Sequence, residues 1–251
     1  MKLSVCLNSV TGKLDKLEAM KLSKRLGYSA VEFWEGAGFP IEEYKKVLDG
    51  EGLTLACMGM ATNLVDPAAR PAFLESVKTS LANAKTLGAK AFIATTGQEL
   101  TDVSREAQRQ SIIDGLKEAA KLMAGSGKIM VLEPLNILVN HKGYFLYSSL
   151  EAFEIIREVN SPEIKVLFDI YHQQISEGNL IQNITENIGL IGHFHVAGNP
   201  GRGEPYMGEI NYGDVFKAAD KAGYTGYAGL EYWPAGDMEE SLKKCLELYE
   251  G

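Results

Sequence analysis

The sequence is poor in cysteine, and its three cysteines form no recognisable pattern. Cys6, Cys57 and Cys245 are far apart, odd in number and without a CxxC pair. Secreted domains that depend on disulfides carry an even and closely spaced set. We therefore expect no disulfide framework, and a reducing cytoplasm as the location.

Long apolar runs are also missing. No segment approaches the roughly 18 apolar residues that cross a bilayer. The N-terminal MKLSVCLNSVTG reads as a strand and a turn, and its apolar part is too short and interrupted for a signal peptide. These absences predict a soluble protein with no membrane partner.

Positive charge is scarce: the sequence has 25 Lys and Arg against 33 Asp and Glu, which gives a net charge of −8. Nucleic-acid affinity depends on Lys and Arg that neutralise phosphates, and no basic run is present. We expect no nucleic-acid partner. The 45% hydrophobic content is that of an ordinary globular protein, so a large core can be buried.

A glycine-rich phosphate loop is absent as well. The first strand is followed by NSVTGK, which holds one glycine and no GxGxxG, so a doubly wound dinucleotide fold is disfavoured. Short apolar strands nevertheless alternate with segments of helical spacing along the whole chain. The helical segments include residues 14–22, 68–87, 105–123 and 150–159, and the predicted strands are 3–7, 30–34, 53–58, 91–95, 129–134, 165–170, 192–197 and 227–232.

Eight such units predict an α/β protein with a single (β/α)8 TIM barrel, which suits 251 residues. The segments LGYSAVEFW, LGAKAFIAT and AGYTGYAGLEYW each end a helix, pass a glycine and enter a strand. Any α/β protein uses such joints, so they support the class more than closure of the barrel. No linker divides the chain, and we expect one domain over residues 1–251.

Four polar side chains stand late in successive predicted strands: Glu133, Asp169, His195 and Glu231. The C-terminal strand ends of a barrel share one mouth, so these groups should converge there and form the active site. Three carboxylates and an imidazole suit a divalent cation such as Mn²⁺, Mg²⁺ or Co²⁺. Any one of them alone would more often be a helix cap or an ion-pair partner. Glu133 and Glu231 also follow the apolar runs IMVL and YAGL, where an unpaired carboxylate is costly.

The C-terminal half resembles the hydroxypyruvate isomerase family of the xylose-isomerase-like barrels, which also include ketose 3-epimerases and an abasic-site endonuclease type. The resemblance rests on the segments EPLN (133–136), NHKGYFL (140–146), DIYHQQISEGNL (169–180), GHFHVAGNPGRGEP (192–205), GEINY (208–212) and GLEYWPAGD (229–237). The N-terminal half matches only in layout.

This resemblance implies that Glu133, Asp169, His195 and Glu231 bind the metal, and that Glu133 and Glu231 exchange the substrate protons. It also implies that His172 and Arg202 contact substrate oxygens. We add Glu204, from the same GRGEP loop, and Trp34, at the end of the second strand, as candidates for substrate binding.

The alternatives for these residues stay open. Arg202 could bind a substrate carboxylate bidentately, or it could brace its loop against Glu204 or Glu209. His172 could be a core histidine, and Trp34 could simply pack at the barrel rim. His193 lies two residues before His195, and we expect it deeper in the barrel as a packing residue.

The predicted reaction converts hydroxypyruvate to tartronate semialdehyde by glutamate-mediated proton transfer through an enediolate. Family members tend to carry Gln in place of His195, as in HVQIA, whereas HFH is closer to the epimerases. A ketose 3-epimerase is therefore the alternative. An abasic-site endonuclease needs several more His ligands than the four His of this chain supply, and a sugar-binding barrel would not need both glutamates. Barrels of this kind often pair through their mouths, which leaves a homo-oligomer open.

Overall fold

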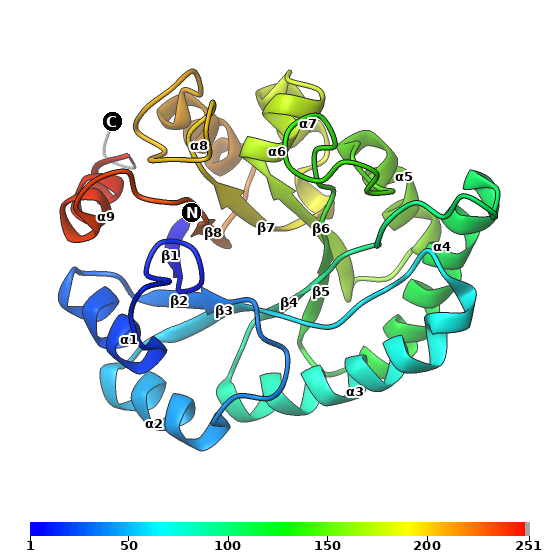
Figure 1. Ribbon diagram of the computed structural model, residues 1–251, viewed down its shortest axis with the longest axis horizontal. Helices are drawn as coiled ribbons and strands as arrows, with labels where there is room; N and C mark the ends of the chain where they lie inside the picture. The colour runs from blue at the N-terminus through cyan, green and yellow to red at the C-terminus, as the bar shows by residue number, and fades with distance from the viewer. Residues whose placement is uncertain (249–251) are drawn as a thin grey trace.

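The computed structural model describes residues 1–248 as a closed barrel of eight parallel strands with helices around it (Figure 1). The strands follow one another in chain order, and β1 pairs with β8 to close the ring. The predicted (β/α)8 barrel is confirmed. Its strands are β1 (Lys2–Cys6), β2 (Ala30–Phe33), β3 (Thr54–Gly59), β4 (Ala91–Ala94), β5 (Ile129–Leu132), β6 (Ile164–Asp169), β7 (Ile191–Val196) and β8 (Tyr227–Leu230).

Each predicted strand is present, with its ends shifted by at most two residues. The helical segments of the sequence are also found, with short 3-10 turns before α3 and β7. The helices are α1 (Lys16–Arg25), α2 (Ile41–Glu51), η1 (Pro67–Ala69), α3 (Arg70–Leu87), α4 (Arg105–Met123), α5 (Ser149–Val159), α6 (Ile170–Ser176), α7 (Leu180–Glu186), η2 (Ile188–Leu190), α8 (Tyr212–Lys221) and α9 (Met238–Glu247). Within residues 1–248, no helix is long and apolar enough to span a bilayer.

Side-chain alternation along the strands separates an outer core from the barrel interior. Outward residues such as Met130, Leu132 and Phe168 belong to a large apolar cluster that includes the helices, whereas Val131 and Leu167 belong to a small separate one. Residues two positions along a strand share a face. The residue that follows Val131 on the inner face of β5 is thus Glu133. The outer face of this strand is apolar, so the charged side chain of Glu133 points into the barrel.

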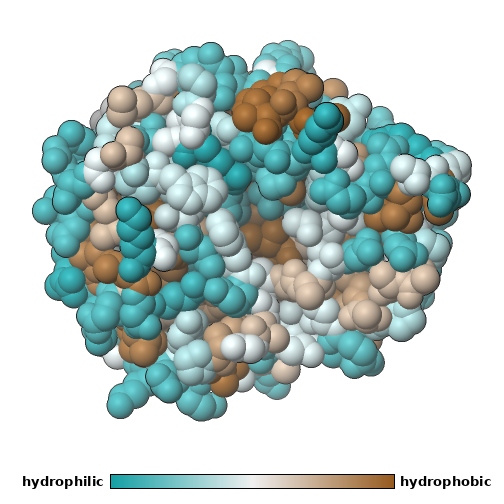
Figure 2. Space-filling model, viewed as in Figure 1, coloured by the Kyte–Doolittle hydropathy of each residue, from teal (hydrophilic) through white to brown (hydrophobic). Residues whose placement is uncertain are grey.

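Figure 2 shows the face of the molecule at which the barrel mouth opens. Hydrophobic residues lie near the middle of this face, and hydrophilic residues surround them. This face is drawn in the orientation of Figure 1, in which the strands surround the centre of the molecule.

A close backbone approach joins β3 to the loop after β2. A Cβ atom on Gly59 would lie 1.7 Å from the carbonyl oxygen of Trp34, which is a backbone atom that cannot rotate away. Gly59→Ala is therefore expected to destabilise the fold by about 1–3 kcal/mol, because the two segments must separate. Denaturant unfolding measures the loss.

Gly50→Ala is the matched control, since Gly50 lies within α2 and a Cβ there would meet nothing within 4 Å. At a position inside a helix, alanine is more favourable than glycine by about 0.8–1 kcal/mol. Gly50→Ala should therefore be at least as stable as the parent. Equal stability of Gly59→Ala and Gly50→Ala would contradict the close approach.

Candidate active site

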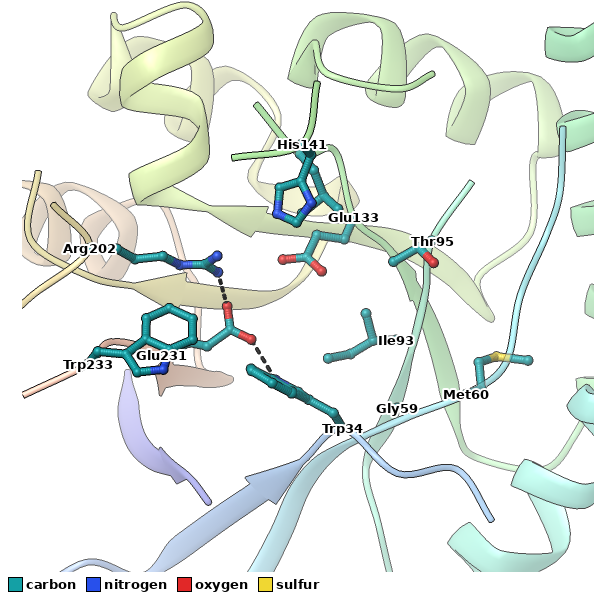
Figure 3. A pocket seen from close by; sticks show the side chains of 11 residues that line it. Trp34, Gly59, Met60, Ile93, Thr95, Glu133, His141, Arg202, Glu231 and Trp233 are labelled. Atoms are coloured by element: carbon teal, nitrogen blue, oxygen red, sulfur yellow. Dashed lines mark hydrogen bonds and ion pairs between the residues drawn. The ribbon is translucent and has the colours of Figure 1, made fainter. Parts of the chain in front are cut away.

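A cavity of about 330 Å³ opens at the C-terminal mouth of the barrel (Figure 3). One side is charged and the other is apolar, so the cavity suits a small polar molecule with a less polar edge. It is lined by Trp34, Gly59, Met60, Ile93, Thr95, Glu133, Leu135, His141, Arg202, Glu231 and Trp233.

The four predicted ligands converge at this cavity, and two of them, Glu133 and Glu231, line it. Asp169 is the last residue of β6 and His195 the fifth of β7, while Glu133 and Glu231 each follow directly on the last residue of β5 and β8. The last two still continue the ladder, because their backbone N–H groups donate to Ala94 and Val196. One potential ligand atom from each of the four residues lies within 4.8 Å of the others.

These four residues fit a divalent cation. All four residues are buried, with exposed fractions of 0–6%. His195 Nδ1 lies 3.3 Å from Glu133 Oε1 and 3.3 Å from Glu231 Oε2. Neither His195 Nδ1 nor Glu133 Oε1 has a hydrogen-bond partner among residues 1–248. Buried polar atoms are nearly always satisfied, so unpaired oxygen and nitrogen atoms that face one another point to an ion between them.

Asp169 has a second task in the fold. Its Oδ1 accepts a hydrogen bond of 3.1 Å from the backbone N–H of His172 and so caps α6. Its Oδ2 faces the Arg202 guanidinium at 3.4 Å. Asp169 therefore caps a helix and forms an ion pair, the two ordinary roles of an acidic residue at a strand end. It is also one of the four residues that could hold the cation.

Arg202 reaches the same group of carboxylates from the loop after β7. Its Nη2 contacts Glu231 Oε2 and Asp169 Oδ2, and the guanidinium lies 5.1 Å from the ring centre of Trp233 and 5.3 Å from that of Tyr171. Figure 3 shows it above Glu231. The possible brace within its own loop is wrong, because the ion pairs that Arg202 makes within residues 1–248 are with Asp169 and Glu231.

Trp34 contributes more than a wall to the cavity. Its indole Nε1–H donates a 2.7 Å hydrogen bond to Glu231 Oε1, so it fixes one carboxylate oxygen while Arg202 contacts the other. The Trp34 backbone N–H donates to Asn8 Oδ1 at 2.9 Å, and Asn8 in turn donates to Glu35. Glu231 is thereby held between the loops that follow β1, β2 and β7.

The two glutamates differ in proton affinity. Burial raises the pKa of Glu133 above its ordinary value, and His195 opposes this shift only in part. Burial acts on Glu231 too, but the neighbouring His195 and Arg202 hold its pKa below the ordinary value. Carboxyl groups pushed apart in this way are typical of an acid–base pair.

Two of the residues predicted to contact substrate, His172 and Glu204, do not line the cavity. The His172 ring is fully buried; its Nδ1 lies 2.6 Å from Asn136 Nδ2, and its Nε2 lies 3.5 Å from Asp169 Oδ2. Glu204 is buried, and its Oε1 accepts a 2.9 Å hydrogen bond from the backbone N–H of Ala235. This environment favours the core-histidine alternative for His172. His141, which follows β5 in the chain, also lines the cavity.

The environment of His172 predicts a pH dependence of stability. Burial lowers the pKa of His172 to about 4, whereas an unfolded histidine has a pKa of about 6.5. Between these values the unfolded chain binds a proton that the folded chain does not, so stability falls as the pH falls from 6.5 to 4. This group contributes up to about 3 kcal/mol of that loss.

Denaturant unfolding of the parent and of His172→Gln at several pH values between 4 and 7 measures this contribution. The variant should lose stability less steeply over the window, whatever its stability at pH 7. Parallel profiles for the two proteins would contradict the assignment.

Glu32 is the buried charge that sequence reasoning missed. It lies in β2 and is 2% exposed, with its carboxylate between Ser4, His193 and His195. His193 is buried as expected, but it is 2.9 Å from Glu32 Oε2 and does more than pack. The signal was present in the sequence, because AVEFW places a glutamate within an apolar strand as IMVLE and YAGLE do.

Together these features define a (β/α)8-barrel enzyme whose mouth holds a buried carboxylate–imidazole centre. Comparison with known proteins agrees. Residues 20–248 match the family described as xylose isomerase-like TIM barrel, and the chain belongs to this family.

Its relatives are named as isomerases, and the chain is an enzyme of the isomerase class. It is 29% identical over 252 residues to hydroxypyruvate isomerase of Escherichia coli, with 97% of each chain covered. It is 33% identical to 2-oxo-tetronate isomerase of Cupriavidus necator, with 86% of each covered. The crystal structure of AP endonuclease, family 2 from Brucella melitensis superimposes with a TM-score of 0.91 at 28% identity, covering 96% of this chain and 97% of that one.

Proposed function

We propose that the protein interconverts a small 2-oxo acid and its aldehyde isomer, with hydroxypyruvate and tartronate semialdehyde as the pair. The observation that carries this proposal is the position of Glu133 and Glu231, whose carboxylates both lie 3.3 Å from His195 Nδ1 and line the same cavity. Two carboxyl groups that face one small chamber can remove a proton from one carbon and return one to its neighbour.

Glu133, Asp169, His195 and Glu231 would hold a divalent cation, whose chemistry is to polarise a carbonyl oxygen and so make the adjacent C–H more acidic. Glu231 has the lower pKa and is the ionised group that accepts the proton from the hydroxymethyl carbon. Glu133, with the raised pKa, delivers a proton to the former carbonyl carbon. The hydroxyl proton passes to the former carbonyl oxygen, so the atoms balance.

The 2-oxo acid is favoured over a free sugar by the charge of the cavity. Arg202 is the permanently charged cation on its wall, and guanidinium matches a carboxylate bidentately. The two isomerases described above are both named for 2-oxo acids. The net charge of −8 disfavours DNA as the substrate.

A ketose 3-epimerase is the second candidate. It would use the same glutamates and invert the carbon beside the carbonyl of a longer substrate. The segment HFH around His195, which the resemblance described above places closer to the epimerases, is the observation in its favour.

The test is incubation of the Mn²⁺-loaded protein with hydroxypyruvate, and separately with a panel of ketoses, followed by metal removal and NMR. In D₂O the proposal predicts growth of an aldehyde signal from hydroxypyruvate, with deuterium at carbon 2 of the product when the transferred proton exchanges with solvent. Inversion of a ketose without conversion of hydroxypyruvate would establish the alternative. Turnover of neither, by protein that binds the cation, would overturn both.

A further inference from the structure

A buried polar cluster lies on the inner face of the barrel, away from the cavity lining, and the proposed reaction does not use it. Its centre is Glu32 of β2. Glu32 Oε2 accepts a 2.6 Å hydrogen bond from Ser4 Oγ and lies 2.9 Å from His193 Nε2. The carboxylate is thereby held at one oxygen by two neighbours.

The other oxygen of Glu32 lies beside a proposed cation ligand. Glu32 Oε1 is 2.9 Å from His195 Nε2, and neither atom has a hydrogen-bond partner within residues 1–248. The opposite ring nitrogen, Nδ1, lies 3.3 Å from both Glu133 Oε1 and Glu231 Oε2. The imidazole therefore lies between Glu32, on its Nε2 side, and the carboxylates of Glu133 and Glu231, on its Nδ1 side.

Gly229 of β8 makes room for this arrangement. A Cβ atom at this position would lie 2.1 Å from Glu32 Oε1 and 2.5 Å from its carboxyl carbon. Gly229 pairs in register with His195 of β7, so the absent side chain leaves the space beside the ring that the Glu32 carboxylate fills. Glycine within a strand often marks such a close approach.

We propose that Glu32 is a positioning residue for His195: it holds the ring as the Nε2–H tautomer and leaves the Nδ1 lone pair for the cation. A neutral imidazole has one donor nitrogen and one acceptor nitrogen, and a carboxylate only accepts. The nitrogen beside Glu32 must then carry the hydrogen. Metal-binding histidines commonly have a carboxylate at their second nitrogen, and its loss typically weakens metal binding about 10–100-fold.

This inference rests on the cation site of the proposed function, and its test separates the two. The first readout is ¹⁵N NMR of histidine-labelled protein with Zn²⁺, which is diamagnetic. His195 should show a protonated Nε2 and a zinc-shifted Nδ1. Zinc on Nε2 of His195, or on His193, would overturn the proposal without any variant.

The second readout is Zn²⁺ affinity, measured by competition with a chromophoric chelator. Glu32→Gln keeps the shape of the side chain but offers an amide, which can donate to Nε2 as well as accept. We expect about 10–100-fold weaker binding and loss of the fixed tautomer. Glu43→Gln is the matched control, since Glu43 is exposed on α2, the helix that follows the same strand, and lies outside the cluster. It should bind Zn²⁺ as the parent does.

The outcomes are distinct. Parent-like Zn²⁺ affinity and an unchanged His195 tautomer in Glu32→Gln would refute the positioning role and leave the cation site standing. Failure of the parent itself to bind Zn²⁺ would refute the cation site. Should Glu32→Gln not fold by circular dichroism, the tautomer of the parent decides the question alone.

Discussion

Replacement of Glu231 by glutamine is expected to lower kcat by about 10³-fold while the fold persists. Proton transfer by a positioned carboxylate contributes about 10²–10⁴ to rate, and an amide cannot take up a proton. The change is nearly isosteric, so Trp34 Nε1–H can still donate to the remaining oxygen. Steady-state kinetics at saturating cation, with thermal unfolding beside them, measure the effect.

Glu209→Gln is the control for this experiment. Glu209 belongs to the same loop as Arg202 but is exposed, and it accepts hydrogen bonds from Asn199 and Gln174 outside the cavity. Its turnover should be that of the parent. Metal content must be measured in Glu231→Gln as well, because a lost cation would also lower kcat. Full turnover by Glu231→Gln would refute its role in proton transfer.

Removal of divalent cations is expected to abolish turnover altogether, and one equivalent of Mn²⁺ or Mg²⁺ should restore it. The same addition should stabilise the fold, because three buried carboxylates gain a counter-charge. A cation at 100 times its Kd adds about 2.7 kcal/mol, which corresponds to about 5–10 °C in Tm for a chain of this size. Activity and Tm are measured after dialysis against a chelator and again after addition of the cation.

Asp169→Asn tests whether this shift arises at the proposed site. Its amide oxygen can still accept the cap hydrogen bond from His172, so α6 should remain. The cation-dependent gain in Tm should shrink strongly. Chelator-treated protein with full activity, or an equal Tm shift in Asp169→Asn, would contradict the assignment of the cation to this site.

Most of the fold could be predicted from the sequence, because strand and helix periods are local properties. The chemistry of the mouth could also be predicted in part, since a residue late in a barrel strand must point to the shared end. Glu133, Asp169, His195 and Glu231 were expected to meet for this reason, and the structure brings them within 4.8 Å.

Contacts across the barrel could not be predicted. The role of Glu32 depends on Gly229 opposite it, 197 positions later in the chain, and this pairing follows from the strand register and tilt rather than from any local pattern. The same holds for the hydrogen bond from Trp34 to Glu231. The partners of Arg202 are set by the path of the loop after β7, and charge alone had pointed to its sequence neighbours.

The most direct measurement is a crystal structure of the Mn²⁺-loaded protein with anomalous scattering at the metal edge. We expect one peak per chain, at about 2.0–2.3 Å from an oxygen of each of the three carboxylates and from His195 Nδ1. A peak bound instead to Glu32 and His193, or ordered protein at saturating Mn²⁺ with no peak in the barrel, would contradict the account.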